Sequence, residues 1–286
     1  MKMKFLSYSY YHSFFTFRKR QINKFLYNLK LLRKFPSSER SQAKLLISSL
    51  KNPYGEREQL VKDYFQEKGT TNVVLRHSFF NYFRLSYDLS DNYQMAIVSE
   101  FLIENVYNFS KLKFVPKNVI DCGGYKGFFT WLALNKFKKS SFICVEPHPQ
   151  NYLSILEVVK ENNLSNIEVV QKAISKSTQP IKLCINGTLS SLYSENGIII
   201  EVEALGLNQI IENKDELLLK VDIEGSEIEF FPEIIYSLPK RCAIYLETHD
   251  SWESLSKIKK TFLENGFEFQ VMRERGLYID SFAQRI

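Results

Sequence analysis

Two short motifs in the C-terminal half carry side chains that could perform chemistry. Lys220-Val-Asp-Ile-Glu-Gly-Ser-Glu227 follows an apolar run, so Asp222 and Glu224 stand where a buried strand ends. Glu247-Thr-His249 follows another apolar run. Alternate residues of a strand share one side, so each motif presents its polar groups together. A histidine beside carboxylates suits a general base or a metal ligand, and a hydrogen-bonded structural histidine would have the same signature.

A glycine-rich turn occurs earlier, in Asn118-Val-Ile-Asp-Cys-Gly-Gly-Tyr-Lys-Gly127. An apolar run suited to a helix follows it, from Phe128 to Leu134. A strand, a glycine turn and a helix N-terminus let the backbone approach an anionic or zwitterionic ligand. The chemistry-bearing residues here are Asp121, Gly123, Gly124 and Gly127. The glycines would equally serve a tight turn with no ligand.

A second acidic residue follows the glycine turn at a spacing that is typical of nucleotide-binding folds. Glu146, in Val145-Glu-Pro-His-Pro149, lies 19 residues after Gly127. An acidic residue that ends the next strand, about 20 residues past the glycines, is placed to accept hydrogen bonds from ribose hydroxyls. The two prolines restrict the loop, so the carboxylate is presented rather than folded away. An ordinary surface glutamate is the alternative.

The elements that must position these residues alternate regularly from residue 117 onward. The pattern predicts strands at 118–122, 141–145, 167–170, 216–222 and 241–247, and helices at 127–137, 149–162, 205–212, 225–236 and 251–265. Residues 181–185 and 198–202 suggest an inserted hairpin, and 266–271 with 276–279 a closing pair of strands. Alternating strands and helices predict an α/β fold with a parallel sheet covered on both faces. Such sheets bind ligands at the carboxyl ends of their strands.

Together these motifs resemble the FkbM-type S-adenosylmethionine-dependent methyltransferases. The resemblance covers about residues 115–275 and rests on five segments: Val119–Gly127, Val145–Pro149, Asn166–Ser175, Leu219–Glu227 and the Glu-x-His ending Leu246–His249. The family more often carries Ala where this chain has Gly124, and we expect that difference not to impair binding.

The resemblance implies a Rossmann-like, seven-stranded class I methyltransferase sheet with helices on both faces. Residues 1–110 are outside the resemblance, and their own patterning predicts a mostly helical N-terminal extension to this sheet. It implies S-adenosylmethionine as cofactor, with Asp121, Gly123 and Gly127 at its amino-acid end and Glu146 at its ribose. Ala173 and Ile174 would lie near the adenine. The full set of implied cofactor-binding residues is Asp121, Gly123, Gly124, Tyr125, Gly127, Glu146, Pro147, Ala173, Ile174 and Asp222.

The family largely methylates hydroxyls of sugars, glycans and natural products, so the resemblance implies O-methylation of such an acceptor. A hydroxyl is a poor nucleophile until it loses its proton, and His249 is our first choice of base, with Asp222 second. A divalent cation could bind Asp222, Glu224, Glu247 and His249, although we do not expect the reaction to need one.

Two other functions stay open. One is a nicotinamide-dependent oxidoreductase on a similar fold, which the G-G-x-x-G spacing and the lack of a Tyr-x-x-x-Lys pair disfavour. The other is a non-catalytic, membrane-surface protein that binds the cofactor.

Charge is divided unevenly along the chain. Residues 1–38 contain nine Lys or Arg and no acid, so a net charge of +6 leaves −3 for the remainder. The basic average therefore does not indicate a nucleic-acid enzyme, and we expect no nucleic-acid partner. Residues 1–36 interleave cations with aromatics, which suits a packed helix with a basic face or a peripheral contact with an anionic membrane. They lack the cleavage site of a secretory signal.

We expect residues 1–110 to form a basic, aromatic arm with a helical extension, and residues 111–286 the methyltransferase domain. Helical patterning covers 40–50, 55–68 and 90–108, with short strands at 73–75 and 79–89. No apolar run is long enough for a membrane span. The four cysteines lack CxxC spacing, which predicts free, buried thiols in a reducing compartment. These features favour a cytoplasmic enzyme, at most peripheral to a membrane, that acts on a small molecule or glycan.

Overall fold

The computed structural model describes residues 72–75, 85–88, 106–186, 189–191, 197–223, 227–249, 252–275 and 278–286. The chain divides into two compact units, Met1–Asn105 and Val106–Ile286. In the first, β1 (Asn72–Leu75) and β2 (Leu85–Asp88) pair antiparallel. The basic arm at 1–36, the helices expected at 40–50 and 55–68, and residues 90–105 of the helix expected at 90–108 lie outside the described residues. The end of that last helix was predicted wrongly, because residues 106–108 are not helical. Within the described part, no helix is long and apolar enough to span a bilayer.

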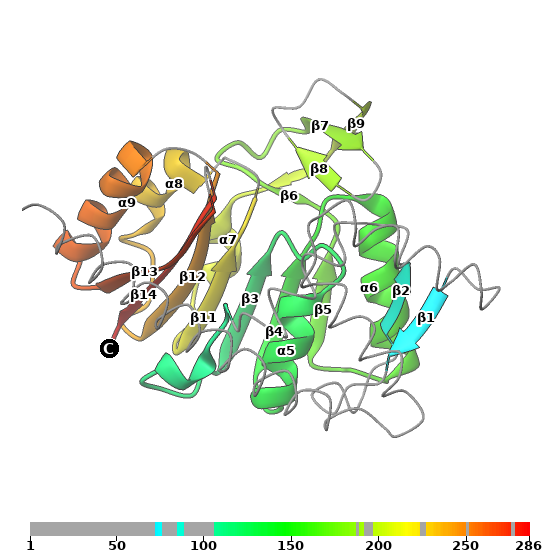
Figure 1. Cartoon of the computed structure of the whole chain (residues 1–286), viewed down its shortest axis with the longest axis horizontal. Helices are drawn as coiled ribbons and strands as arrows, with labels where there is room; N and C mark the ends of the chain where they lie inside the picture. The colour runs from blue at the N-terminus through cyan, green and yellow to red at the C-terminus, as the bar shows by residue number, and fades with distance from the viewer. Residues whose placement is uncertain are drawn as a thin grey trace, which may run out of the picture. The chain divides into compact units, whose positions relative to one another are not determined.

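The second unit is built on one seven-stranded sheet (Figure 1). Its strand order is β13-β14-β12-β11-β3-β4-β5. The five parallel strands are β3 (Asn118–Cys122), β4 (Ser141–Val145), β5 (Ile167–Val170), β11 (Leu217–Val221) and β12 (Cys242–Thr248). An antiparallel pair, β13 (Glu268–Arg275) and β14 (Tyr278–Arg285), completes one edge. The expected Rossmann-like class I fold is confirmed.

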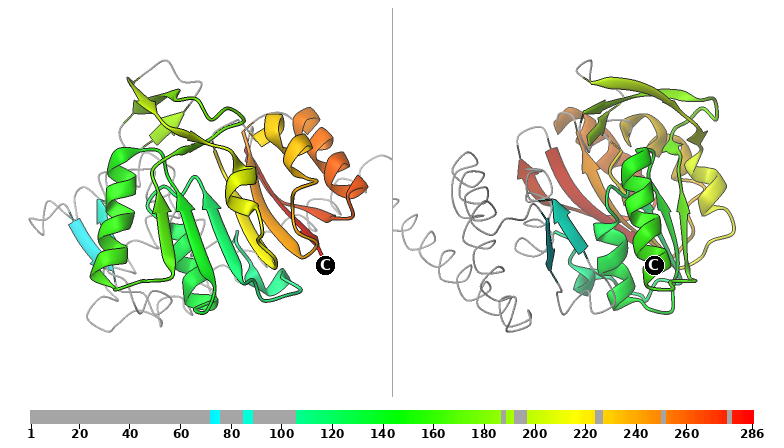
Figure 2. Two further views of the ribbon diagram at one scale, coloured as in Figure 1. Left: turned by 180° about the vertical axis from the view of Figure 1, so that it is seen from behind. Right: turned by 90° about the vertical axis from the view of Figure 1, so that its right-hand side faces the viewer.

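Helices cover both faces of this sheet. They are α5 (Phe128–Lys136), α6 (Pro149–Glu161), α7 (Leu207–Ile211), α8 (Glu227–Ile234) and α9 (Trp252–Glu264). Figure 1 shows α5 in front of the strands, and the left view of Figure 2 shows α7 in front of the opposite face. A single helical turn, η4 (Phe109–Lys111), precedes β3. Each helix expected after residue 117 is present within a few residues of its predicted bounds.

Smaller strands lie beyond the main sheet. β6 (Ala173–Ile174) pairs parallel with β10 (Ala204–Leu205). The expected insertion is present as an antiparallel pair, β7 (Ile181–Asn186) and β9 (Ile198–Val202). A third strand, β8 (Leu189–Ser191), pairs antiparallel with the other side of β7. All four cysteines are free and buried, as expected.

The closing strands run further than expected. Strand β14 was expected to end at residue 279 and continues to Arg285, because it pairs with β12 on one side and β13 on the other. That double pairing buries Asp280, Ser281 and Gln284, although polar residues do not predict a buried strand. Tertiary pairing outweighs the local pattern here.

Two hydrophobic clusters hold the sheet to its helices. In the first cluster, β11 is buried along its whole length and packs with α8 and α9 through Phe231 and Phe262. On the face of α5, an edge-to-face aromatic cluster joins Tyr107 and Phe109 to Phe129 of the helix and Tyr245 of β12, with ring centroids 5.0–6.2 Å apart. These contacts fix α5, and with it the glycine turn, against the carboxyl edge of the strands.

Candidate active site

The polar motifs meet at one edge of the sheet. Strands β12, β11, β3 and β4 are neighbours in that order and run parallel. Their carboxyl ends carry, respectively, His249, Asp222, the glycine turn and Glu146. The sheet therefore brings together four motifs that are spread over more than a hundred residues of sequence.

Gly123 makes room for the neighbouring strand rather than only for a ligand. Its φ is +78°, and a Cβ built on it would lie 1.8 Å from the backbone oxygen of Asp222. Any side chain at this position would therefore displace the loop that carries Asp222. Gly127 also has a φ of +78°, and a Cβ there would lie 2.6 Å from the indole ring of Trp131.

Gly124 is constrained by its own neighbour. A Cβ at this position would lie 2.4 Å from Sγ of Cys144, which is fully buried on β4. Alanine is common here in the resembled family, but in this chain Gly124 and Cys144 share one small space. The expectation that the difference does not impair ligand binding stays a prediction, but for packing the position is not interchangeable.

We therefore expect Gly124→Ala to lower the free energy of unfolding by about 1–3 kcal/mol, the usual range for overpacking a core. Cys144→Ala removes the sulfur that the new methyl group meets, so the double variant should be more stable than the sum of the two single changes predicts. Urea unfolding of all four proteins measures this coupling. Strict additivity would show that the two residues do not compete for this space.

A buried lysine connects the glycine turn to Asp222. Lys220 Nζ lies 3.5 Å from Asp121 Oδ1 and 3.2 Å from Asp222 Oδ2, and it donates to the backbone oxygen of Gly123 at 2.5 Å. Burial alone would lower the pKa of Lys220, but Asp222 and Asp121 outweigh burial and raise the pKa above its usual value. Lys220 is therefore a fixed cation that holds two strand ends and the turn together.

Asp121 is enclosed by protein groups. Its side chain is 1% exposed, and Oδ2 accepts from the backbone N–H of Thr130 at 3.2 Å and from its hydroxyl at 2.8 Å. Gly127 occupies the N-cap position of α5 and offers no side-chain acceptor, so Asp121 caps the first turn of the helix from the neighbouring strand. Burial raises the pKa of Asp121, and Lys220 opposes that rise.

Glu146 faces the same turn from the next strand. The residue is 3% exposed, and its two oxygens accept from the backbone N–H groups of Tyr125, at 2.6 Å, and His148, at 2.8 Å. Tyr125 has a φ of +50°, which aims its N–H at the carboxylate. Burial raises the pKa of Glu146 to about 7, even though both hydrogen bonds act to lower it. This carboxyl group is therefore poised to change charge near neutral pH.

His249 lies in the middle of an acidic cluster. Its Nδ1 is 3.2 Å from Oε1 of Glu227, and its Nε2 is 3.5 Å from Oδ1 of Asp222 and 3.9 Å from Oε1 of Glu247. Glu227 is fully buried at the start of α8, and the same Oε1 accepts from the backbone N–H of Ile223 at 3.0 Å. The ring of Tyr278 meets the imidazole edge-to-face at 5.3 Å. One carboxylate thus holds both the histidine and the Asp222 loop.

A family model described as the methyltransferase FkbM domain matches residues 121–269, which is more than half of the chain. The chain belongs to the FkbM methyltransferase family. The match begins at Asp121 and includes the glycine turn, Glu146, the Lys220–Glu227 motif and His249. None of the curated proteins compared with the chain matches it.

The solved structures to which the chain is similar include one in complex with AdoMet and one FkbM methyltransferase. TYW2 from M. jannaschii, in complex with AdoMet, is 16% identical, with 76% of this chain and 88% of that one covered and a TM-score of 0.44. The FkbM methyltransferase from Methylobacillus flagellatus KT is 12% identical, with coverage of 92% and 59% and a TM-score of 0.46. Similarity at this level adds nothing to the family match.

The other residues that were expected to contact the cofactor in the FkbM domain differ in what they pack against. Tyr125 and Pro147 are half-buried beside the turn. Ile174 packs into the main core, whereas Ala173 packs under the β7–β9 insertion with Leu183 and Val202. Direct contact of these residues with a cofactor stays a prediction.

The residues of this FkbM domain that could hold a metal ion differ from the four ligands expected from the sequence. The ligand atoms of Asp222, Glu227 and His249 lie within 4.8 Å of one another, close enough for one cation. Glu224 lies outside the described residues, and Glu247, whose Oε1 is 3.9 Å from His249 Nε2, is not part of this group. The contact between Glu227 and Nδ1 suits a hydrogen-bonded pair as well as it suits a shared ligand, so no metal follows from the cluster alone.

Glu227 and Thr130 are the residues that the sequence analysis missed. Glu227 ends the Asp-Ile-Glu-Gly-Ser-Glu motif, and its fixed spacing from Asp222 was a usable signal. Nothing in the sequence singles out Thr130, because its role depends on how α5 packs on β3.

Proposed function

We propose that this FkbM-family protein is an S-adenosylmethionine-dependent O-methyltransferase acting on a hydroxyl of a sugar, glycan or natural product. Family membership supports methyl transfer. The observation that carries the choice of a hydroxyl is the pair Glu227–His249, set beside Asp222 at the ligand-binding edge of the sheet. An oriented histidine is the group that a hydroxyl acceptor requires and that a more nucleophilic acceptor does not.

The charges of the site fit this cofactor. Three carboxylates lie around His249, those of Asp222, Glu227 and Glu247, and Lys220 pairs with Asp222. This group of carboxylates favours a cationic ligand, and when bound S-adenosylmethionine supplies an electrophilic methyl group on a cationic sulfur. Glu146, at the end of the adjacent strand, would hold the ribose hydroxyls.

His249 would act as the general base through Nε2. With Nδ1–H donated to the buried Glu227, the lone pair of Nε2 points toward Asp222 and Glu247. The acceptor hydroxyl would lose its proton to Nε2 as its oxygen attacks the methyl carbon, and the carbon–sulfur bond would break with its electron pair left on sulfur, so that S-adenosylhomocysteine leaves. The imidazolium formed would lie between the carboxylates of Glu227 and Asp222, which stabilise its charge. A carboxylate orients the histidine in the same way in many hydrolases and in other transferases.

Lys220 and Asp121 would act by positioning. Lys220 ties the loop of Asp222 to the backbone oxygen of Gly123, and Asp121 ties the turn to α5. In-line methyl transfer needs the oxygen, methyl carbon and sulfur aligned, so the main duty of the protein is to hold both sides of the site rigid.

The affinity for S-adenosylmethionine should rise as the pH rises through about 7. Glu146 has its pKa raised to about 7, so the free protein is largely protonated there below neutrality. Ribose hydroxyls donate best to the ionised carboxylate, and binding below pH 7 must therefore also remove a proton. We expect a roughly tenfold loss of affinity for each pH unit below this pKa. Calorimetric titrations from pH 5.5 to 8.5 would measure it.

The control for this prediction is Glu146→Gln, which keeps the shape and cannot ionise. Its affinity should be lower at pH 8 and nearly independent of pH. An unchanged pH dependence in the variant would assign the titration to another group and remove Glu146 from the ribose contact.

The proposed reaction can be tested without knowing the acceptor. Purified protein is incubated with S-adenosylmethionine labelled in its methyl group and with a glycan and metabolite extract, and the labelled products are characterised by mass spectrometry and NMR. The proposal expects the label on oxygen. A label found on nitrogen or carbon would contradict O-methylation while leaving methyl transfer intact.

A further inference from the structure

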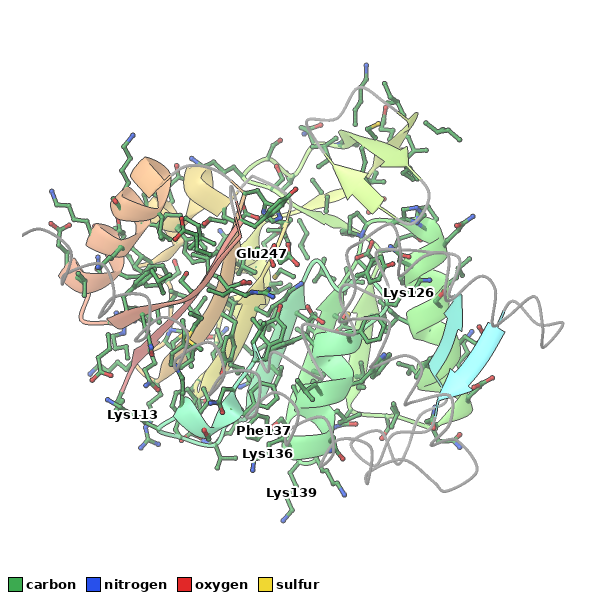
Figure 3. The ribbon with its side chains drawn as sticks, viewed as in Figure 1. Lys113, Lys126, Lys136, Phe137, Lys139 and Glu247 are labelled. Carbon is green, nitrogen blue, oxygen red and sulfur yellow. The ribbon has the colours of Figure 1, made fainter. Side chains whose placement is uncertain are left out.

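A groove of about 740 Å³ lies where the parallel strands begin, whereas the candidate active site lies where they end. We call this amino-terminal side of the sheet the basic edge. Its walls come from the segment before β3, from the end of α5 and from the residues that precede β11 and β12. Its cationic lining residues are Lys113, Lys117, Lys136, Lys138, Lys139 and Arg241. Figure 3 shows Lys113, Lys136 and Lys139 projecting from this edge, away from Glu247 near the other end of the strands.

The positive charge of this edge is not a property of the whole unit. Residues 106–286 hold 21 Lys or Arg and 23 Asp or Glu, a formal net charge of −2. In the described part of the chain, six cations line the groove, and the ion pairs found there join some of them to Asp215, Glu216 and Glu268. A local excess of positive charge on an acidic body marks this edge as a surface for an anionic partner.

Structural duties explain only part of this charge. Lys117 and Arg241 are paired with Glu216, and Lys113 with Glu268. Lys136 lies in the last turn of α5, where a cation offsets the helix dipole. Lys139 lies beyond the helix end, and in the described part of the chain no acid lies within ion-pair distance of it or of Lys136.

An apolar side chain stands among the lysines. Val115 is 72% exposed on the rim of the groove, in the sequence Lys113-Phe-Val-Pro-Lys117. A nucleic acid or a soluble anion would gain little from an exposed valine. A lipid surface gains from both features, because lysines meet the anionic headgroups while an apolar tip enters the boundary of the acyl chains.

We propose that this basic edge docks on an anionic membrane surface, with a headgroup phosphate in the groove and Val115 at the acyl boundary. The contact is independent of residues 1–36 and goes beyond the proposed methyl transfer. A strand of five residues such as β3 separates the two edges by roughly 16 Å, so the candidate active site faces the aqueous phase while the protein is docked.

A probe at position 115 reports this contact separately from the basic N-terminal arm. The four native cysteines are buried, so Val115→Cys in the full chain can be labelled selectively with an environment-sensitive fluorophore. Vesicles of phosphatidylcholine with phosphatidylserine should shift its emission to the blue, and vesicles of phosphatidylcholine alone should not. High salt should reverse the shift, because exposed charges are screened.

Charge reversal tests the partner. In the labelled protein, Lys136→Glu with Lys139→Glu should raise the lipid concentration that gives half of the emission shift by roughly fivefold or more for each lysine. The matched control reverses Lys259 and Lys260, two exposed lysines of α9, and should leave the shift unchanged. Unchanged affinity for S-adenosylmethionine in both variants shows that the fold is intact.

Three outcomes would overturn the proposal. The first is no emission change on anionic vesicles, which would mean that Val115 does not meet lipid. The second is an equal loss of the shift in both charge-reversal pairs. The third is the same shift with single-stranded nucleic acid or polyphosphate in the absence of lipid, which would assign the edge to a soluble polyanion.

Discussion

Replacing His249 with alanine is expected to lower the rate of methyl transfer by about 100- to 10,000-fold, the usual contribution of a general base. The affinity for S-adenosylmethionine should change little, because the turn, Lys220 and Glu146 remain in place. The reason is geometric: Nε2 of His249 opens onto Asp222 at the carboxyl edge, and Nδ1 is already held by Glu227. Single-turnover transfer of labelled methyl, together with calorimetry, separates the two quantities.

Glu227→Gln is the companion variant. The amide can still accept from the backbone N–H of Ile223 and from Nδ1–H, but it cannot stabilise an imidazolium by charge. We expect kcat to fall with little change in KM, because the imidazolium formed during the reaction loses the charge that stabilises it. A variant His249→Ala with near-native activity, or a Glu227→Gln protein with native kcat, would remove the pair from the mechanism.

Lys220→Met is expected to lower the free energy of unfolding at pH 7 by about 3–5 kcal/mol, the cost of breaking a buried charge pair from one side. The methionine fills most of the space, but Asp121 is left buried without the cation 3.5 Å from its Oδ1. The backbone oxygen of Gly123 also loses its donor. Urea unfolding measures the difference, and Lys240→Met, at an exposed lysine, is the control that should change stability by less than about 0.5 kcal/mol.

The pH dependence of this loss has a defined sign. Burial already raises the pKa of Asp121, and Lys220 opposes that rise, so the variant raises the folded-state pKa further. An acid whose pKa is higher in the folded state than in the unfolded state loses stability as the pH rises through that interval. The deficit of Lys220→Met should therefore shrink on acidification. A deficit below about 1 kcal/mol at pH 7 would show that the lysine is dispensable for the fold.

Local pattern was enough to predict the framework of the FkbM domain. Apolar runs gave β3, β4, β11 and β12 within a residue or two. Because parallel strands end at a common edge, their terminal residues could be placed together before any contact was known. Glu146 and His249 were found in this way.

What sequence could not supply depends on which strands are neighbours. Gly123 is glycine because the backbone oxygen of Asp222 lies against it, and Gly124 because Cys144 does. These partners are distant in sequence, so a ligand or a tight turn were the two reasons for the glycines that the sequence offered. Asp121 likewise looked like a ligand-binding carboxylate, whereas packing of α5 on β3 gives it Thr130 as a partner.

Glu227 was hidden for a different reason. A glutamate at the start of a helix is common on protein surfaces, where it complements the helix dipole. Only the packing of α8 against the sheet buries it fully and turns it toward His249.

The most direct test of the central claim is calorimetric titration of the full-length protein with S-adenosylmethionine and, separately, with NAD. The account predicts saturable, one-to-one binding of S-adenosylmethionine at pH 8 and no heat of binding with NAD. Binding of NAD without binding of S-adenosylmethionine would contradict it.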